Sequence, residues 1–260
     1  MNNVMNMWNE GSDEYFKNIR HGLDMIFDNA GRAFPAPVRK MINGAFPDLD
    51  GCRVIVPSSG DNVAAFGFHL LGAEVVSCDI AERQLYNAKK IADGYGWDIN
   101  FIKQDSMELP EIENGEYDLV YTSNGVHVWI PDLPKMYKTF VRVLKQGGRY
   151  IMFETHPFIR PFDDGGDEVK IVKPYEDTGP NVTEGIARYA WRVQDIINAI
   201  INAGFHIERV EEFHPQINDY DDWFYGDPKK AEEDGYIKFD WKINPWAALP
   251  QWIGLSAVKK

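Results

Sequence analysis

A chain of 260 residues with 44% hydrophobic and 26% charged residues can bury a sizeable core and has an ordinary globular composition. Its formal net charge of −13 repels phosphate backbones, and no run of Lys or Arg offsets that charge, so we expect no nucleic-acid partner. No apolar stretch approaches the ~20 residues of a membrane helix, and the first residues resemble neither a secretory signal nor a transit peptide. We therefore expect no membrane association and a cytoplasmic location.

The N-terminal segment of residues 1–48 has a mixed helical pattern, broken at Phe34–Pro37, where two prolines disfavour a continuous helix. We interpret this segment as a helical cap on a single domain that spans residues 1–260. The two cysteines, Cys52 and Cys78, are expected to be small apolar residues at or near buried strands. Their spacing fits no zinc site, and the other potential ligands also lack metal-binding spacing, so we predict no metal.

Beyond residue 50, short apolar runs alternate with helical patterns. Strands are predicted at residues 53–56, 74–79, 101–102, 117–122, 150–154, 205–213 and 252–258. Helices are predicted between Asp61 and Gly72 and at residues 82–95, 133–144 and 192–203. Residues 155–185 have the pattern of a long polar loop, and residues 216–250 that of an aromatic-rich lid insertion. The alternation predicts a doubly wound α/β fold, a mostly parallel sheet with helices on both faces.

In such sheets, ligands bind beyond the carboxyl ends of the strands at the topological switch point. This rule places residues 57–61, 79–80, 105–106 and 123–129 around one crevice. Asp79 ends the second strand about 20 residues after the first turn, where a carboxylate can accept both hydroxyls of an adenosine ribose. Its alternative role is a helix N-cap. Asp105 follows the third strand and is a candidate acceptor for an adenine amino group, or an ordinary turn residue.

These segments together resemble the class I S-adenosylmethionine-dependent methyltransferases, in particular the branch that acts on small molecules. The resemblance covers residues 50–155 and the tail, and it rests on Val54–Asp61, Asp79–Ile80, Gln104–Ser106, Tyr117–Val120, Arg142–Gly148 and Ala203–Phe205. It implies a seven-stranded, Rossmann-like methyltransferase fold in which residues 252–258 form an antiparallel strand between the fifth and sixth strands. It also implies S-adenosylmethionine as cofactor and a small-molecule methyl acceptor as partner.

The resemblance assigns cofactor binding to the residues at the crevice. These are Pro57, Ser58, Ser59, Gly60, Asp79, Ile80, Asp105, Ser106, Asn124 and Gly125. The leading aromatics Trp8, Tyr15 and Phe16 are expected either to close over the cofactor or to pack a helix against the core.

The first turn departs from the glycine-rich pattern of that family. Val56 stands in place of the usual acid, Ser58 in place of the first glycine and Asn62 in place of the third, and only Gly60 remains. Glycine permits a positive φ and close approach of a ligand to the backbone. Asn is the non-glycine residue that best tolerates left-handed geometry. We therefore expect an atypical loop that still works, and the absence of Gly-x-Gly-x-x-Gly disfavours a nicotinamide oxidoreductase.

Methyl transfer from a sulfonium is a direct displacement that depends chiefly on aligning the nucleophile. A base is needed only when the nucleophile holds its proton, and His127, just beyond the fourth strand, is our candidate catalytic base. Its alternative role is to orient the loop. We assign substrate binding to Trp129, His156 and Arg160, against the alternatives of core packing for Trp129 and a solvated loop for the other two.

Two hypotheses about function follow. The first is an active methyltransferase acting on a small molecule. The alternative is a catalytically inactive methyltransferase-like protein that binds an adenosine-containing ligand, prompted by the serines of the first turn. The fourth strand is not followed by the [Asn/Asp/Ser]-Pro-Pro-aromatic tetrapeptide of amide and exocyclic-amine methylation, which weakens DNA-adenine and protein-glutamine methylation as activities.

Overall fold

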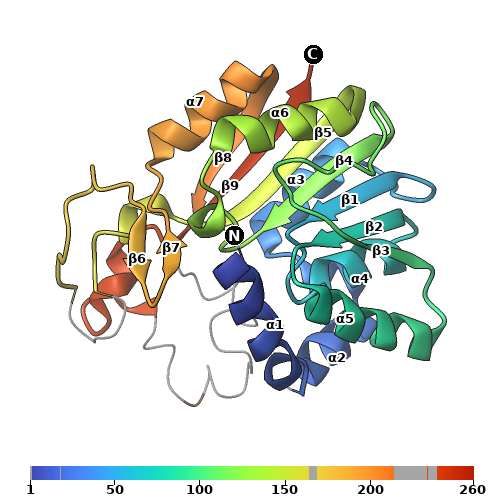
Figure 1. Cartoon of the computed structure of the whole chain (residues 1–260), viewed down its shortest axis with the longest axis horizontal. Helices are drawn as coiled ribbons and strands as arrows, with labels where there is room; N and C mark the ends of the chain where they lie inside the picture. Colours follow the sequence, from blue (N-terminus) through green and yellow to red (C-terminus); the bar gives the residue numbers. More distant parts are fainter. Residues whose placement is uncertain (1, 18, 164–168, 214–232, 234–238) are drawn as a thin grey trace.

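The computed structural model describes residues 2–17, 19–163, 169–213, 233 and 239–260 (Figure 1). Its α-helices are α1 (Asn2–Lys17), α2 (Arg20–Asp28), α3 (Ala36–Ala45), α4 (Val63–Leu70), α5 (Glu82–Tyr95), α6 (Leu133–Val143) and α7 (Val193–Ala203). Short 3-10 turns are η1 (Ala30–Ala33), η2 (His127–Trp129), η3 (Pro157–Ile159) and η5 (Pro245–Ala248). The strands are β1 (Arg53–Pro57), β2 (Glu74–Asp79), β3 (Ile99–Lys103), β4 (Tyr117–Ser123), β5 (Leu144–Thr155), β6 (Asn181–Thr183), β7 (Ile186–Arg188), β8 (Phe205–Phe213) and β9 (Trp252–Lys259).

One seven-stranded sheet has the order β3-β2-β1-β4-β5-β9-β8. The pairings among β3, β2, β1, β4 and β5 are parallel. Strand β9 is antiparallel to both β5 and β8 and lies between them. The prediction of a mostly parallel sheet with one inserted antiparallel strand is confirmed.

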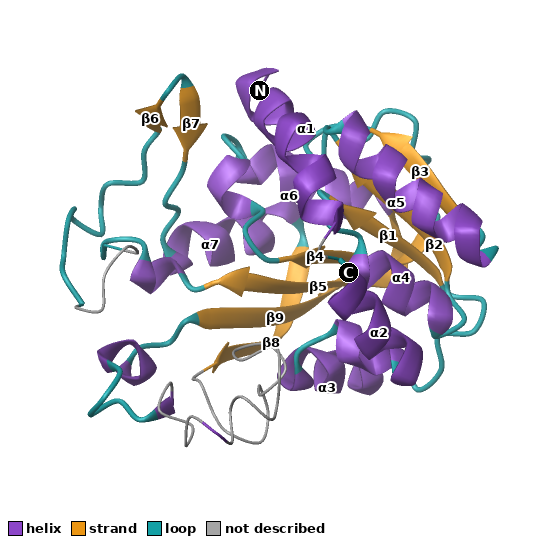
Figure 2. Ribbon diagram, turned by 90° about the horizontal axis from the view of Figure 1, so that it is seen from below, coloured by secondary structure: helices purple, strands orange, loops and turns teal. Residues whose placement is uncertain are grey.

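The central strands are apolar on both faces because both faces are covered by helices. In β1, Val54 and Val56 join the hydrophobic cluster that includes residues of α2 to α5, whereas Ile55 joins the cluster that includes α6 and α7. Figure 2 shows α3 and α4 on one side of the sheet and α6 and α7 on the other. Alternate residues of one strand thus supply the two halves of the core.

Residues 155–185 differ from the predicted long polar loop. They contain η3 and β6, and β6 pairs with β7 in a hairpin with the register Asn181↔Arg188, Val182↔Ala187 and Thr183↔Ile186. Each of its strands has three residues, which is too short to produce a detectable alternation in sequence.

The strand predicted at residues 150–154 begins earlier than expected, because β5 starts at Leu144, directly after α6. Gly147 and Gly148 lie within β5, beside a register shift in its pairing with β4. A Cβ atom on Gly148 would come within 2.9 Å of the Lys145 carbonyl oxygen, so this irregular stretch requires glycine.

Within residues 1–48, α1 lies across the carboxyl ends of the strands (Figure 1), and α2, η1 and α3 contribute to the hydrophobic cluster on one face of the sheet. The predicted lid of residues 216–250 falls mostly outside the described residues, which resume at 239 and include η5. Among the residues described, no helix has the length and apolar character that a membrane crossing requires. The assignment of the chain to a single domain stays a prediction.

Candidate functional site

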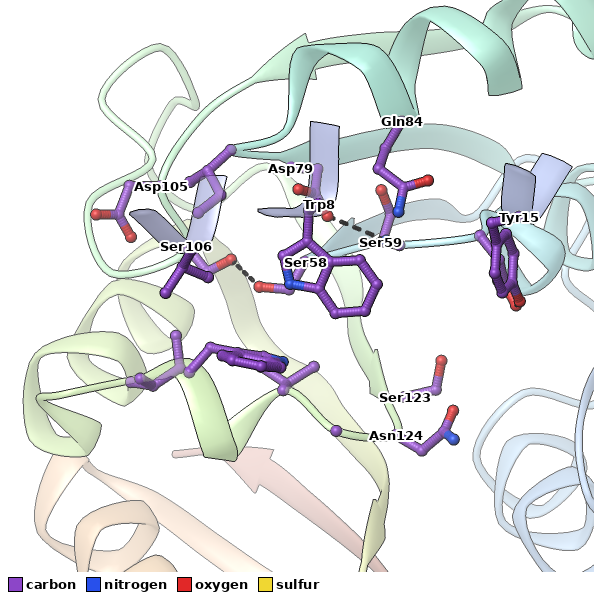
Figure 3. A pocket seen from close by; sticks show the side chains of 18 residues that line it. Trp8, Tyr15, Ser58, Ser59, Asp79, Gln84, Asp105, Ser106, Ser123 and Asn124 are labelled. Atoms are coloured by element: carbon purple, nitrogen blue, oxygen red, sulfur yellow. Dashed lines mark hydrogen bonds between the residues drawn. The ribbon is translucent and has the colours of Figure 1, made fainter. Parts of the chain in front are cut away.

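A pocket of about 260 Å³, which we call the strand-end pocket, opens beyond the carboxyl ends of β1 to β4. Its walls come from α1, α5 and the loops that follow these strands: Val4, Trp8, Tyr15, Ser58, Ser59, Gly60, Asp61, Asp79, Ile80, Gln84, Asp105, Ser106, Ser123, Asn124, Gly125, Val126, Trp129 and Ile130 (Figure 3). Every residue expected to bind the cofactor lines this pocket except Pro57, which is buried at the end of β1. Side chains from four separate loops therefore meet here, as the switch-point rule predicts.

The loop after β1 has left-handed backbone geometry at the positions where the family pattern has glycine. The φ angles are 53° at Ser58, 51° at Gly60 and 64° at Asn62. Left-handed geometry costs a residue with a Cβ roughly 1–2 kcal/mol, so other contacts must hold Ser58 and Asn62 there.

Side chains of this loop and of its neighbours supply such contacts. The Ser58 and Ser106 hydroxyl oxygens lie 2.5 Å apart, which joins this loop to the loop after β3. The Ser77 hydroxyl of β2 donates to the Ser59 hydroxyl at 2.8 Å. The buried Asn62 amide donates to the Gly60 carbonyl at 2.8 Å. The serines and the asparagine thus hold the loop by hydrogen bonds in the left-handed geometry that glycine adopts without such bonds.

Asp79 lines the pocket, where it is a candidate ribose acceptor, and its side chain also bonds the turn that leads into α5, although the N-cap residue of that helix is Ala81. Asp79 is 8% exposed, accepts the Ala81 N–H at 2.8 Å at the start of α5, and accepts the Gly60 N–H at 3.0 Å. Burial raises the pKa of its carboxyl group, and the backbone N–H bonds oppose that shift. A carboxylate has about four lone-pair sites, so the two N–H bonds leave acceptor capacity facing the pocket.

Asp105 is half-buried at the opposite end of the pocket from Tyr15 in Figure 3. Its Oδ1 accepts the Met107 N–H at 2.9 Å, which is a turn contact, and burial raises the pKa of its carboxyl group. As with Asp79, the turn contact leaves a carboxylate oxygen on the pocket wall.

Helix α1 covers the pocket with Val4, Trp8 and Tyr15, which share one helix face. The Tyr15 hydroxyl donates to Asp61 Oδ2 at 2.8 Å, and Trp8 meets Trp129 edge to face with ring centroids 5.8 Å apart. Trp8 and Tyr15 thus have the covering position considered from the sequence. Phe16 instead packs against the hydrophobic core.

The loop after β4 is held by Glu154, a residue that sequence analysis placed only within a strand. Its side chain is 2% exposed and accepts the backbone N–H groups of Gly125 at 2.6 Å, His127 at 3.1 Å and Thr155 at 2.7 Å. A buried acid at a strand end, opposite a loop of the neighbouring strand, is the signal that could have identified it. Glu154 sets the position of the pocket wall that includes Asn124 and Gly125.

His127 lies behind that wall. Its ring is not among the side chains that line the strand-end pocket, because η2 directs Val126 and Trp129 to the pocket instead. Its Nε2 is 2.7 Å from the Tyr137 hydroxyl of α6, and its Nδ1 is 3.4 Å from Glu154 Oε2. Burial lowers the pKa of the ring. This geometry fits the role of orienting the loop better than that of a base.

The three predicted substrate-binding residues have different positions. Trp129 lines the pocket. His156 is buried, and its ring accepts the Phe158 N–H at 3.0 Å and contacts Glu212 at 2.9 Å. Neither His156 nor the half-buried Arg160 is among the pocket-lining residues.

Comparison with known proteins matches residues 58–148 to a family model described as a methyltransferase domain. The chain is 26% identical over 197 residues to the sterol 24-C-methyltransferase of Pneumocystis carinii, covering 71% of this chain and 50% of that protein. It is 34% identical over 86 residues to the demethylmenaquinone methyltransferase of Thermus thermophilus, covering 33% of this chain and 38% of that protein. The chain spans about half the length of the curated relatives it matches.

Among solved structures, the S-adenosylmethionine-dependent methyltransferase from Mesorhizobium loti superimposes with a TM-score of 0.63 and 24% identity, covering 85% of this chain and 97% of that one. That likeness concerns the fold, whereas the family match concerns the loops after β1 to β4, which carry the pocket. Residues 58–148 therefore match a methyltransferase-domain model, and the chain has the Rossmann-like fold of the S-adenosylmethionine-dependent methyltransferases.

Proposed function

We propose that this protein transfers a methyl group from S-adenosylmethionine to a small molecule by direct displacement. The observation that carries the proposal is the strand-end pocket, in which Asp79, Asp105 and the loop Ser58–Gly60 line one cavity. The named activities of the relatives, on a sterol and on demethylmenaquinone, support a small-molecule acceptor. The net charge of −13 supports the absence of a nucleic-acid partner, and the expected cytoplasmic location stays a proposal.

The residues of the pocket fit this cofactor. Asp79 would accept the ribose hydroxyls and Asp105 the adenine amino group. An added Cβ would meet no atom within 4 Å at Gly60 or Gly125, so the backbone at both positions faces open space that a ligand can approach closely. The carboxyl groups of the lining favour a ligand with a positive charge.

When bound, S-adenosylmethionine supplies a methyl group on a sulfonium, and the bond that breaks leaves its electron pair on a neutral thioether sulfur. The protein need not protonate that leaving group, so its residues act mainly by alignment. The aromatic faces of Trp8 and Trp129 attract a sulfonium. Glu154 and His127 position the wall at Gly125 and act through it as positioning residues.

Calorimetric titration with S-adenosylmethionine and S-adenosylhomocysteine tests this function. We expect saturable binding of both, and about 100-fold weaker binding by Asp79→Ala, because a buried carboxylate that accepts hydroxyl bonds contributes about 3 kcal/mol. Since Asp79 also holds Gly60 and Ala81, Asp105→Asn provides a second variant, with an expected loss of about 10-fold. The exposed Asp98→Asn is the matched control.

Undiminished affinity in both folded variants would remove the ribose and adenine assignments. Failure of the wild-type protein to bind either compound would overturn the cofactor assignment itself. The activity would be established if the protein binds the cofactor, transfers its methyl group to an acceptor and releases S-adenosylhomocysteine.

A further inference from the structure

A second pocket, of about 450 Å³, adjoins the strand-end pocket, and we call it the hairpin pocket. It is lined by Asn3, Val4, Trp129, Pro131, Gly185, Ala187 and Tyr189. Val4 and Trp129 line both pockets, so the two cavities share a wall. A displacement requires the nucleophile to reach the methyl carbon in line with the bond that breaks, so an acceptor must bind in a cavity adjoining the cofactor.

Hydrogen bonds fix the hairpin β6–β7 against the rest of this pocket. The Tyr189 N–H donates to the Val128 carbonyl at 2.8 Å, and the Trp191 indole N–H donates to the Ile130 carbonyl at 2.8 Å. On the other side, the Asn3 amide donates to the Gly185 carbonyl at 2.8 Å. The hairpin is thereby tied to the loop after β4 and to α1, which are also walls of the strand-end pocket.

The lining of the hairpin pocket includes two aromatic residues and no charged one, in contrast to the acidic strand-end pocket. The Tyr189 ring stacks on Trp191 with an angle of 6° between the ring planes, which fixes its orientation. Trp129 contributes a second aromatic surface. Two aromatic surfaces in a lining that also has polar atoms favour a flat ring that carries a polar group.

Arg188 does not itself line the hairpin pocket, but it contacts Trp129, which does. The Arg188 guanidinium lies over the Trp129 ring, 5.6 Å from its centroid. Among the residues that the structure describes, no carboxylate pairs with Arg188, although the chain has 40 acidic and 27 basic residues. The N–H donors of a guanidinium lie in its plane and match the two oxygens of a carboxylate.

We propose that the hairpin pocket binds the methyl acceptor and that this acceptor is an aromatic carboxylate, with its carboxylate paired to Arg188 and its ring against Trp129 and Tyr189. This inference rests on the proposed function, since it names the substrate class of the same site. The surface of a protein with a net charge of −13 repels anions, so an acidic acceptor needs a local cation. A cationic sulfonium bound in the adjoining strand-end pocket would also attract an anionic acceptor.

The test compares two probes that differ in charge and hardly in shape, 1-naphthoate and 1-naphthamide, titrated into the protein loaded with S-adenosylhomocysteine. We expect the wild-type protein to bind 1-naphthoate more tightly than 1-naphthamide. Arg188→Gln should weaken 1-naphthoate binding about 10-fold, as loss of a charged hydrogen bond does, and change 1-naphthamide binding about 2-fold at most. Arg209→Gln, an exposed arginine paired with Glu211 on β8, is the control and should change neither.

Ala187→Trp locates the binding, because Ala187 lines only the hairpin pocket and a bulky ring there should abolish binding of both probes. Equal binding of the two probes, or 1-naphthoate affinity that survives Arg188→Gln or Ala187→Trp, would overturn the proposal. So would a loss of S-adenosylhomocysteine affinity in Arg188→Gln, since Arg188 would then serve the cofactor. By contrast, a wild-type protein that fails to bind S-adenosylhomocysteine contradicts the proposed function itself.

Discussion

The floor and the roof of the strand-end pocket are built in different ways. The floor consists of the loops after β1 to β4, and buried carboxylate, amide and hydroxyl groups hold it, such as Asp79, Asn62 and Glu154. The roof is α1, to which the hairpin β6–β7 is tied, and it is held by hydrogen bonds at exposed sites, such as Tyr15–Asp61, Arg83–Asp13 and Asn3–Gly185. Buried polar bonds are costly to break and exposed ones are not. The floor should therefore be rigid and essential for folding, and the roof adjustable.

The largest effect should come from Glu154→Ala. This change removes the acceptor of three backbone N–H groups, and we expect the free energy of unfolding to fall by about 3–5 kcal/mol. Urea denaturation measures it. Glu208→Ala, which breaks the partly exposed pair with Arg149, is the control and should cost less than about 1 kcal/mol. If Glu154→Ala and Glu208→Ala lowered the free energy of unfolding equally, the buried bonds of the floor would be no more stabilising than a partly exposed ion pair.

Asn62 should have the next largest effect, and two variants separate its contributions. Asn62→Ala loses the side-chain hydrogen bonds and puts a Cβ at a φ of 64°, so we expect a loss of about 2–3 kcal/mol. Asn62→Gly loses the same bonds without the backbone strain and should be about 1 kcal/mol more stable than Asn62→Ala. If denaturation midpoints rank the alanine variant above the glycine variant, the left-handed geometry is not what selects Asn here.

His127 should make stability depend on pH. Burial lowers its pKa in the folded chain, whereas the unfolded chain keeps a value of about 6.5. As the pH falls below about 6.5, the unfolded chain takes up the proton and the folded chain does not. The stability that the neutral ring allows is therefore present above about pH 6.5 and is lost on acidification. Relative to His127→Gln, the wild-type protein should lose about 1–2 kcal/mol between pH 7 and pH 5.

Denaturation of both proteins across this pH range gives the comparison. Other groups titrate alike in the two proteins, including Asp61 and Asp79, whose pKa values burial raises. The difference between the proteins therefore isolates the imidazole. Parallel pH profiles would mean that the ring protonates as easily in the folded state as in the unfolded one.

The smallest effect should come from the roof. Arg83→Ala removes the exposed bidentate pair with Asp13 of α1, and we expect little change in the free energy of unfolding. Hydrogen exchange should instead show faster exchange of α1 amides, with the floor unchanged. If Arg83→Ala lowered the free energy of unfolding as much as Glu154→Ala does, the proposed difference between roof and floor would be wrong.

The sequence alone determined the sheet, the order of its elements and most of the floor. Strands buried on both faces must be apolar runs, and the helices between them must carry an apolar stripe, so both are visible as local patterns. Because parallel strands end at one edge, the positions of Ser58, Asp79, Asp105 and Asn124 just after predicted strands suffice to assign them to one crevice.

Only the tertiary structure decided which side chains face the pocket and what holds them. His127 and Trp129 are two residues apart, yet the first points to Tyr137 behind the wall and the second into the pocket. Glu154 contacts Gly125 and His127, and Arg188 contacts Trp129, and each of these partners is distant in sequence. Contacts between distant segments depend on packing geometry, which periodicity and motif spacing do not encode.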